Sequence, residues 1–562
     1  MLTPYKAHLR FCLFTLLVLI CFTLAPLAAL DAQTDAPCGV VDAIGYPVEN
    51  LMETTIRPGF DDFSLYRARF SGNHVGIDIA FNQQGAPVRA VARGRVTLSD
   101  VEEWDTEKGV VILEHVFPDG SRYFSLYGHM EVTNEISFPE VGQCVEMGDT
   151  VGAVGWPSRG APHLHYEIRN FLPDDGGPGY VTGNPLLEGW YHPLDFTHLW
   201  QIRLTPAFNS AVTFEAIPTV PPVILESGTV VVASDNVVAG VNPAGLVLWR
   251  ITTDGRVIGL RGMSGERVVA HTTNSQVVML TDGSYTALWN FRGAEEEAFV
   301  AAGETLLFTA PDGGLAAFSP EGQIQWTLPA PANAQVNGSG FRVLEFATNP
   351  DPLHGTTIAQ MLRVENQVVL RVVNPAGDTL FDALVGTNAV IAPAMSGGWM
   401  LLADNRLQHI LPTGDALTLG EVNAAPGRTA RLASDVTNNI YLFMGDAENT
   451  LLSWDHQGGV RWRVRYPAVS EGLLPPLMKS DLGCLLYILD ADGRLNVFNA
   501  ATGDMLTQVE LYAGGTQNRR PAARLLDLLP DGRVRVNAGF LSTITLNSAA
   551  LGGEALNSCL LG

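Results

Sequence analysis

Two histidines separated by one residue, His163 and His165, lie in the stretch Ala161-Pro-His-Leu-His-Tyr-Glu-Ile-Arg169. Alternate side chains of a β-strand point to the same face, so both imidazoles would share a face with Glu167, opposite an apolar face. Neutral imidazole is the commonest protein ligand for zinc, and two on one face can reach the same small volume. The pattern predicts a metal-binding strand, against the simpler interpretation of two unrelated histidines on a hydrated strand.

A second segment, Gly72-Asn-His-Val-Gly-Ile-Asp-Ile-Ala80, places His74 and Asp78 four residues apart. This spacing suits a helix or a strand, but Gly76 and the β-branched residues around it favour a strand. His74, Asp78 and one histidine of the later pair would supply two nitrogens and a carboxylate. Three protein ligands leave a fourth position open, which is typical of catalytic rather than structural zinc.

The order of these motifs resembles the lysostaphin-type zinc endopeptidases, which cut peptidoglycan cross-bridges. The resemblance covers about residues 40–195 and rests on His74-x-x-x-Asp78, Tyr127-Gly-His129, His163-x-His165 and the connecting segments Gly85–Ala90, Gly109–His115 and Val145–Gly152. It implies a zinc site made by His74, Asp78 and His165. It also implies that His129 and His163 stand beside the metal without binding it.

The implied reaction is hydrolysis of a peptide bond by a metallo-endopeptidase. The chain has no His-Glu-x-x-His motif, so the glutamate base of that class of zinc protease is missing. Proton transfer and stabilisation of the oxyanion then fall to His129 and His163, because imidazoles titrate near working pH. The sequence does not distinguish their roles, and Glu167 is a candidate carboxylate to orient either of them.

Two other functions fit the same residues. Many relatives with this fold have lost ligands and only regulate other enzymes, so a catalytically silent cell-wall regulator or binding protein is the first alternative. The second is a zinc peptidase that acts on secreted proteins, with the C-terminal part as its substrate adaptor. Because all five positions are filled, the sequence favours an enzyme, and the resemblance implies peptidoglycan peptides as its partners.

Composition indicates a β-rich globular protein of at least two domains. The chain has 562 residues, including 57 glycines and 34 prolines, and its aliphatic residues often alternate with polar ones. The net charge of −24 argues against phosphate contacts, so nucleic acid is not an expected partner. The same charge gives no long-range attraction to an anionic cell wall, so recognition should be short-range.

Residues 1–32 have the pattern of a secretory signal peptide. Lys6 and Arg10 precede the apolar run Phe11–Leu24, and small residues follow it. The apolar run is short for a membrane span, which makes an uncleaved anchor the less favoured alternative. Export predicts an extracellular, cell-wall-associated or periplasmic protein.

Four cysteines follow this leader: Cys38, Cys144, Cys484 and Cys559. Export permits disulfides. Two of the cysteines lie in the peptidase-like region and two near the C-terminus, so Cys38–Cys144 with Cys484–Cys559 is the most economical of the three pairings. Free buried thiols are the alternative.

A weaker pattern repeats after about residue 225. A glycine is followed four residues later by an aromatic residue at Gly245–Trp249, Gly322–Trp326, Gly377–Phe381 and Gly458–Trp462. The usual step of about forty residues matches a four-stranded propeller blade. Residues 485–503 resemble the repeat of quinoprotein-type β-propellers, which implies the architecture without implying a quinone cofactor. Two stacked β-sandwiches are the alternative.

The predicted fold is all-β, with a small antiparallel-sheet zinc peptidase domain over residues 39–200 and a C-terminal β-propeller of about seven blades over residues 226–562. The proline-containing residues 201–225 are expected to form a linker or an extended arm. One blade is expected to be closed by segments from both ends. The propeller carries no cluster with metal-ligand spacing, so it is not expected to take part in the chemistry. Because repeat scaffolds commonly present surfaces for partners, it is expected to bind an unknown protein or glycan ligand.

Overall fold

A computed structural model describes residues 36–49, 63–102, 109–158, 160–172, 176–293, 299–331, 341–351, 353–422, 430–445, 449–467, 475–491, 493–511, 524–529, 531–539 and 541–561. The chain divides into two compact units, Met1–Pro193 and Leu194–Gly562. The predicted signal peptide, residues 1–32, lies outside the described residues. Among those residues, no helix has the length and apolar character needed to cross a membrane.

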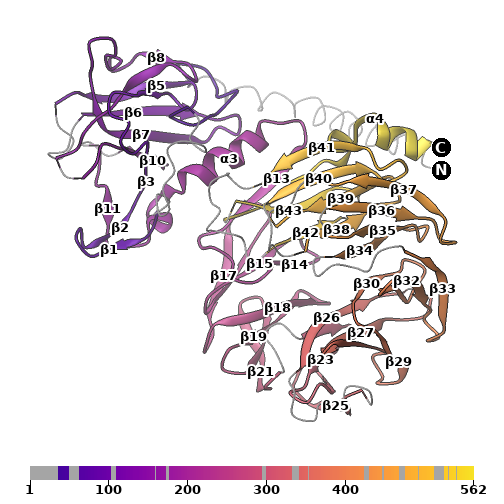
Figure 1. Cartoon of the computed structure of the whole chain (residues 1–562). Coiled ribbons are helices and arrows are strands. Elements are labelled where there is room, and N and C mark those ends of the chain that lie inside the picture. The colour runs from indigo at the N-terminus through magenta and orange to yellow at the C-terminus, as the bar shows by residue number, and fades with distance from the viewer. Residues whose placement is uncertain are drawn as a thin grey trace, which may run out of the picture. The chain divides into compact units, whose positions relative to one another are not determined.

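The first unit is built around a nine-stranded antiparallel sheet (Figure 1). Its strands are β3 (Ile77–Ile79), β4 (Pro87–Arg89), β5 (Gly94–Asp100), β6 (Gly109–Val116), β7 (Arg122–Glu131), β8 (Cys144–Val145), β9 (Thr150–Val154), β10 (Leu164–Arg169) and β12 (Trp190–Tyr191). The central path runs β12-β10-β7-β6-β5-β8, while β3 pairs with β10 and β9 pairs with β4 and β7. The central strands β6 and β10 are buried almost throughout, which explains their β-branched and apolar residues.

A second, three-stranded sheet in this unit carries one of the predicted metal ligands. It consists of β1 (Tyr66–Arg67), β2 (Gly72–His74) and β11 (Tyr180–Val181), in the order β1-β2-β11. A short 3-10 helix, η1 (Pro185–Glu188), then leads to β12. The disulfide Cys38–Cys144 is present and ties the N-terminal segment to β8, so this predicted pairing is confirmed.

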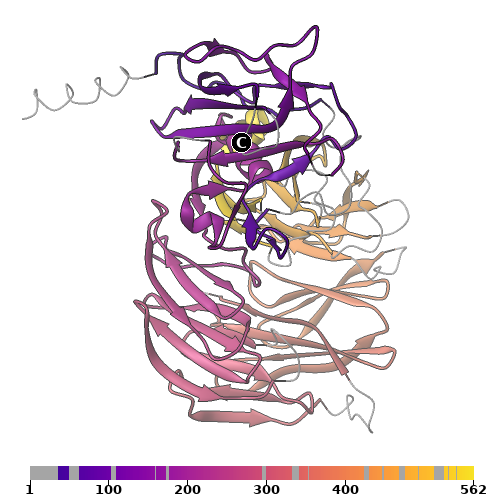
Figure 2. The same ribbon diagram turned by 90° about the vertical axis from the view of Figure 1, so that its left-hand side faces the viewer.

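The second unit begins with most of helix α3 (Pro193–Arg203), and its described residues form eight four-stranded sheets (Figures 1 and 2). The first four sheets contain β14 (Val223–Ile224), β15 (Val230–Ser234), β16 (Val237–Val241) and β17 (Val247–Thr252); β18 (Val257–Met263), β19 (Arg267–Thr272), β20 (Gln276–Thr281) and β21 (Ser284–Asn290); β22 (Phe299–Ala302), β23 (Thr305–Thr309), β24 (Leu315–Phe318) and β25 (Ile324–Leu328); and β26 (Phe341–Asn349), β27 (Thr357–Val364), β28 (Gln367–Val373) and β29 (Thr379–Gly386).

The remaining four sheets contain β30 (Ala389–Pro393), β31 (Trp399–Ala403), β32 (Arg406–Ile410) and β33 (Ala416–Glu421); β34 (Arg431–Ser434), β35 (Ile440–Phe443), β36 (Thr450–Trp454) and β37 (Val460–Arg465); β38 (Leu477–Ser480), β39 (Leu485–Leu489), β40 (Arg494–Asn499) and β41 (Met505–Glu510); and β13 (Phe208–Thr213) with β42 (Leu526–Leu528), β43 (Val534–Ala538) and β44 (Ser542–Leu546). Helix α4 (Ser548–Leu561) follows the last strand.

Buried apolar residues fill the spaces between consecutive sheets, which makes these sheets the blades of a propeller. One cluster joins Val231 of the first sheet to Leu260 of the second. Similar clusters join each later pair as far as the sheet that begins with β38, and β38 in turn contacts β42. Val212 of β13 packs on Val230 of the first sheet, which closes the ring.

Two details differ from the sequence-based expectation. The described residues form eight blades rather than about seven. The expected blade built from both ends of the unit is present, since β13 joins β42–β44. The expected linker, residues 201–225, instead contains β13 and β14, so the propeller unit begins before the predicted boundary. The prolines in this segment indicate an irregular backbone. Its strand β13 cannot be recognised from the local sequence, because its partner β44 lies more than 300 positions away in the chain.

The repeated glycine and tryptophan residues form one packing device. Gly377, with a φ of +93°, closes the turn before β29, and a side-chain carbon placed on it would lie 2.8 Å from the indole of Trp326 in the preceding blade. The indole N–H of Trp326 donates to the carbonyl of Pro375 in the same turn at 2.9 Å. Gly503 and Trp462 repeat this arrangement in a later pair of blades. The tryptophans therefore join neighbouring blades rather than lining a ligand site.

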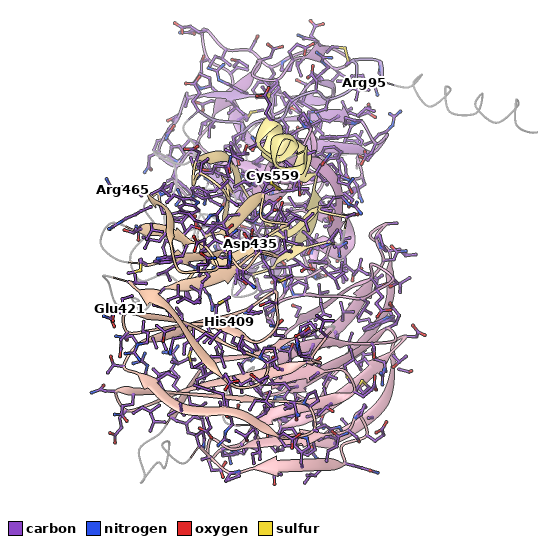
Figure 3. All side chains as sticks on the ribbon, turned by 90° about the vertical axis from the view of Figure 1, so that its right-hand side faces the viewer. Arg95, His409, Glu421, Asp435, Arg465 and Cys559 are labelled. Carbon is purple, nitrogen blue, oxygen red and sulfur yellow. A yellow bond between two sulfur atoms is a disulfide. The ribbon has the colours of Figure 1, made fainter. Side chains whose placement is uncertain are left out.

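The C-terminal helix α4 is fastened to the propeller by the second disulfide. Cys559, labelled in Figure 3, bonds to Cys484 just before β39, which confirms the second predicted pairing. Helix α4 also contacts β40 and β41. The sequence predicts neither α3 nor α4, because both are short and neither shows a clear amphipathic period.

The tryptophan contact can be separated from the backbone strain of a left-handed turn. Gly245 occupies the same turn position before β17, with a φ of +85°, and a side-chain carbon placed on it would meet no atom within 4 Å. Gly245→Ala should therefore lower the free energy of unfolding by about 1–2 kcal/mol through backbone strain. Gly377→Ala should cost a further ~1–3 kcal/mol because the indole must also move. Equal losses in urea unfolding would contradict this role of Trp326.

Candidate metal centre

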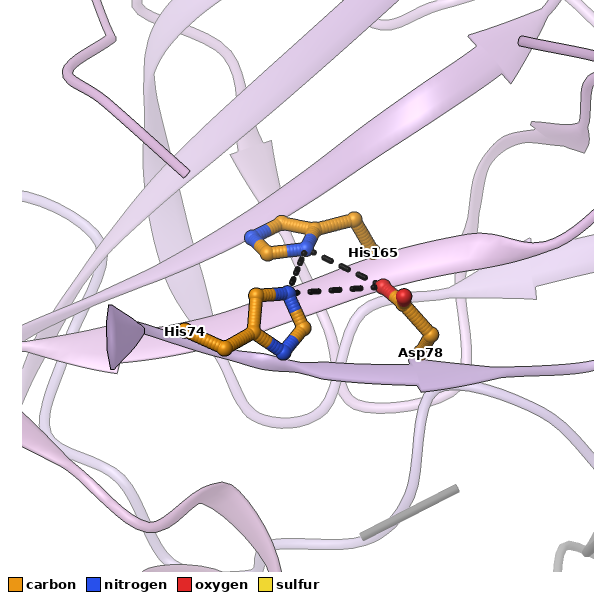
Figure 4. A group of neighbouring side chains, drawn as sticks. All are labelled: His74, Asp78 and His165. Atoms are coloured by element: carbon orange, nitrogen blue, oxygen red, sulfur yellow. Dashed lines mark hydrogen bonds and ion pairs between the residues drawn. The ribbon is translucent and has the colours of Figure 1, made fainter. Parts of the chain in front are cut away.

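The structure brings together three of the predicted site residues, His74, Asp78 and His165 (Figure 4). His74 Nε2 lies 3.1 Å from His165 Nδ1, and Asp78 Oδ1 lies 3.2 Å from the same nitrogen. The third separation, from His74 Nε2 to Asp78 Oδ1, is 3.6 Å. Both imidazoles are almost fully buried, whereas the Asp78 carboxylate is partly exposed.

This donor set fits zinc in both chemistry and spacing. Imidazole nitrogens and carboxylate oxygens are common zinc ligands, and three of them leave one position of a tetrahedron for a substrate or water. Metal–ligand bonds of about 2.0–2.1 Å at tetrahedral angles place ligand atoms about 3.3 Å apart. The three observed separations, 3.1, 3.2 and 3.6 Å, scatter around that value.

Strand register explains how residues from distant segments meet. His165 in β10 lies directly opposite Asp78 of β3 on one side and Gly128 of β7 on the other. The segment around His74, predicted as one strand, is divided between β2 and β3, which belong to different sheets. Gly76 lies between β2 and β3, where the chain passes from one sheet to the other. A side-chain carbon placed on it would lie 2.9 Å from the His165 ring and 2.6 Å from the carbonyl oxygen of Tyr166.

The two predicted catalytic histidines lie beside this group. His163 Nε2 is 3.6 Å from Asp78 Oδ1, and its Nδ1 donates to the carbonyl of Ala161 at 2.8 Å. The ring of His129 meets that of His163 edge to face, with centroids 4.8 Å apart, and its centroid is 6.0 Å from that of His165. The structure therefore brings all five predicted site residues together, and their individual roles stay predictions.

The backbone at His129 departs from a regular strand. Its φ is +58°, and the pairing of β6 with β7 shifts register between Tyr127 and Met130. The carbonyl of His129 accepts a hydrogen bond from Gly155 N–H at 2.8 Å, and a side-chain carbon at Gly155 would come within 2.5 Å of that oxygen. Such bulges re-aim a side chain, and this one turns His129 toward the site.

Charge and burial shift the pKa values of the clustered groups. Burial tends to raise the pKa of Asp78, but the hydrogen bond with His165 and the charges of the neighbouring histidines outweigh it and hold this pKa well below its usual range. Burial, followed by the nearby His165 and His163, lowers the pKa of His129 to about 3. His129 is therefore neutral at physiological pH, and Asp78 is an anion.

The carboxylate expected to orient His129 or His163 serves another ring. Glu167 Oε1 accepts a hydrogen bond from His165 Nε2 at 2.8 Å, so among the contacts described here Glu167 orients the metal-ligand candidate instead. The sequence placed Glu167 and His165 on one strand face correctly. On that buried face His165 is only two positions from Glu167, whereas His163 is four positions away, so the carboxylate reaches the His165 ring first.

Aromatic residues that sequence reasoning did not assign to the site hold the histidine rings. Tyr180 of β11 stacks on His74, with centroids 4.8 Å apart, and Phe81 stacks on His163 at 5.3 Å. Tyr180 pairs with His74 across the small sheet. No local pattern marks these residues, because their positions depend on which strands become neighbours.

The sequence profile of peptidase family M23 matches residues 72–178, the segment that carries all five site residues. Residues 72–178 are a peptidase family M23 domain. A second profile, described as outer membrane protein assembly factor BamB, matches residues 193–350 in the propeller unit. The chain is therefore a peptidase with a propeller module, and no curated protein matches it significantly.

Several solved structures align with about 60% of the chain. They include BamB from Moraxella catarrhalis, with 14% identity, 60% of this chain and 99% of that chain covered, and a TM-score of 0.43. Sqt1 from Saccharomyces cerevisiae aligns at 14% identity over 60% and 98% of the two chains with a TM-score of 0.44. Quinohemoprotein alcohol dehydrogenase from Comamonas testosteroni aligns at 13% identity over 60% and 76%, with a TM-score of 0.41. These loose likenesses carry no argument about activity.

Loss of one ligand from the M23 domain should remove the metal. A three-ligand site reduced to two loses both affinity and geometry, so His74→Ala and Asp78→Ala should each purify without zinc. His163→Ala is the matched control, because His163 borders Asp78 at 3.6 Å but lies outside the three-residue group. Elemental analysis of the folded variants measures the outcome. Full zinc occupancy in both ligand variants would contradict the assignment.

Proposed function

We propose that this chain is a zinc-dependent endopeptidase that hydrolyses peptide bonds in the cross-links of bacterial peptidoglycan. The observation that carries the proposal is the group of His74, Asp78 and His165, flanked by His129 and His163 within an M23 domain. Three protein ligands would leave one position of a tetrahedral zinc site for water or substrate. The filled ligand set favours an enzyme over a silent regulator of the same fold.

The three ligands would hold zinc, and His163 has the geometry of a proton acceptor. A bound zinc supplies Lewis acidity, which polarises a carbonyl and makes water acidic enough to attack it near neutral pH. A carbonyl oxygen can only accept, so the hydrogen bond to Ala161 fixes the proton of neutral His163 on Nδ1. Its Nε2 then carries a lone pair toward the site and can take a proton from the attacking water.

His129 is suited to the complementary role of hydrogen-bond donor. Its lowered pKa keeps the ring neutral at working pH, so one ring nitrogen carries a proton without adding a second positive charge beside the metal. A donor held in place by the bulge at His129 and Gly155 can stabilise the oxygen on which negative charge develops. The two histidines thus divide proton transfer and charge stabilisation between them.

The proposal places the protein outside the cytoplasm. Two disulfides are typical of oxidising compartments, and the leader pattern of residues 1–32 is that of an exported protein. The propeller would act as a binding module for a glycan or protein of the cell envelope. Repeat scaffolds often present such surfaces, and the one group of metal-ligating residues found in the described chain lies in the other unit.

Substitution of either flanking histidine should remove turnover without removing zinc. His129→Ala and His163→Ala should each lower kcat by ~10²–10⁴-fold with little change in KM, because the lost contacts act mainly in the transition state. His192→Ala is the control, since His192 is buried in the same unit and packs on Phe63 but belongs neither to the three-residue group nor to the flanking pair. Zinc loss in His129→Ala or His163→Ala, with retention in His165→Ala, would overturn the assignment of ligands.

The substrate is tested by digesting purified peptidoglycan with the full chain and analysing the released fragments by mass. We expect new amino termini within the cross-links, and no fragments with Asp78→Ala. Casein and other unfolded proteins serve as competing substrates. Cleavage of these proteins with intact peptidoglycan would refute the cell-wall substrate while leaving the peptidase assignment in place.

A further inference from the structure

A buried hydrogen-bond network of Glu167, Arg169 and Trp190 lies next to His165. Glu167 Oε2 accepts a hydrogen bond from Trp190 Nε1 at 3.0 Å and another from Arg169 Nη1 at 3.3 Å. Its other oxygen, Oε1, accepts from His165 Nε2 at 2.8 Å. Glu167 and Arg169 have no exposed surface, and Trp190 is 4% exposed. Water therefore cannot readily replace any of these contacts.

Trp190 and Arg169 can only donate hydrogen bonds to Glu167, so the direction of these bonds is fixed. An indole N–H and a guanidinium N–H only donate, so Oε2 of Glu167 must accept from Trp190 and Arg169. An ionised carboxylate accepts through both oxygens, so Oε1 requires a proton on the His165 nitrogen that faces it. That nitrogen is Nε2, while Nδ1 faces Asp78 and His74 at 3.2 and 3.1 Å.

We propose that Glu167, held by Trp190 and Arg169, is a positioning residue that keeps the proton of His165 on Nε2 and so reserves Nδ1 for the metal. The inference rests on the proposed function, because it concerns a ligand that the peptidase needs. A histidine can bind a metal only through a nitrogen without a proton, so the choice between its two nitrogens decides whether the ligand set is complete.

Trp190 extends this site beyond the matched family segment. The M23 profile ends at residue 178, whereas Trp190 lies in β12. This strand follows η1 and pairs with the end of β10. In that pairing Trp190 lies directly opposite Arg169, so one strand register places both donors around the Glu167 carboxylate. Through Trp190, the segment 185–191 belongs to the functional unit, although none of its residues is in the metal-ligand group.

The amide of glutamine has the same shape as the carboxylate but only one acceptor oxygen. In Glu167→Gln, that oxygen must face the two obligate donors, Trp190 and Arg169, and the NH₂ group must then face His165 Nε2. The ring would accept at Nε2 and carry its proton on Nδ1, the nitrogen that faces Asp78. Glu167→Ala leaves no group that enforces this wrong form, so His165 could still present Nδ1.

The order of zinc affinity of Glu167→Gln and Glu167→Ala therefore differs between two roles of Glu167, positioning the His165 proton and merely filling space. If Glu167 positions the proton, zinc affinity in chelator competition should fall ~10–100-fold in Glu167→Gln and less in Glu167→Ala. If Glu167 only fills space, the isosteric glutamine should bind zinc better than alanine, because alanine leaves a cavity. That second ranking, or wild-type affinity in a folded Glu167→Gln chain, would overturn the proposal.

A second pair of variants decides the matter if loss of the Glu167 charge beside buried Arg169 prevents folding. Trp190→Phe keeps the ion pair and removes only one donor with part of the ring, and it should weaken zinc binding. Tyr191→Phe is the matched control on the same strand, since the Tyr191 hydroxyl accepts from Asn170 at 3.3 Å rather than donating to Glu167. Equal zinc affinity in folded Trp190→Phe and Tyr191→Phe chains would overturn the proposal.

The readout separates this inference from the proposed function. Zinc affinity is measured in full chains without substrate, alongside the thermal unfolding of each variant. A wild-type chain that binds zinc and shows the expected ranking, but leaves peptidoglycan intact, would refute the cell-wall function and support the positioning role. A wild-type chain that binds no zinc would overturn both.

Discussion

The site depends above all on the register of β10 between β3 and β7. This register sets His165 opposite Asp78, 87 positions earlier in the chain, and opposite the side-chain-free Gly128. A slip of one residue would turn His165 and Glu167 to the other face and bring Leu164 and Tyr166 into their place. The apolar back of β10 is fully buried, so burial of that face fixes the register on which the ligand group relies.

Burial then imposes conditions on every polar group in this part of the sheet. A charged group removed from water is costly unless it is paired, and each acid here has partners. Asp78 is surrounded by three histidines, and Glu167 by His165, Arg169 and Trp190. The same contacts that compensate for burial also orient the rings. Stability and function thus use one set of hydrogen bonds, which leaves few substitutions neutral for both.

The propeller is governed by contacts between blades rather than within them. Each blade is an antiparallel sheet too small to bury both of its faces, and the apolar clusters therefore bridge consecutive blades. The glycine turns and tryptophans repeat because the same contact recurs at successive joints. Closure of the ring by β13 removes the open end that a linear stack of blades would expose.

The sequence by itself determined the residue types of the site and the period of the repeats. His74, Asp78, His163 and His165 are recognisable because their residue types and spacing suit metal ligation, whereas His129 is identified only through the resemblance of the motif order to a known family. The alternation in residues 163–167 also put His165 and Glu167 on one face. The pairing of cysteines followed from their separation along the chain, and both disulfides are present.

Only the tertiary structure decided which groups touch. The roles of Glu167, Trp190 and Tyr180, the eighth blade and the strand within residues 201–225 all depend on pairings between residues far apart in the chain. Such pairings are selected by the burial of whole sheet faces, an energy summed over many residues. A local pattern can show that a residue is able to donate, accept or pack, but the partner is fixed only when the sheet assembles around it.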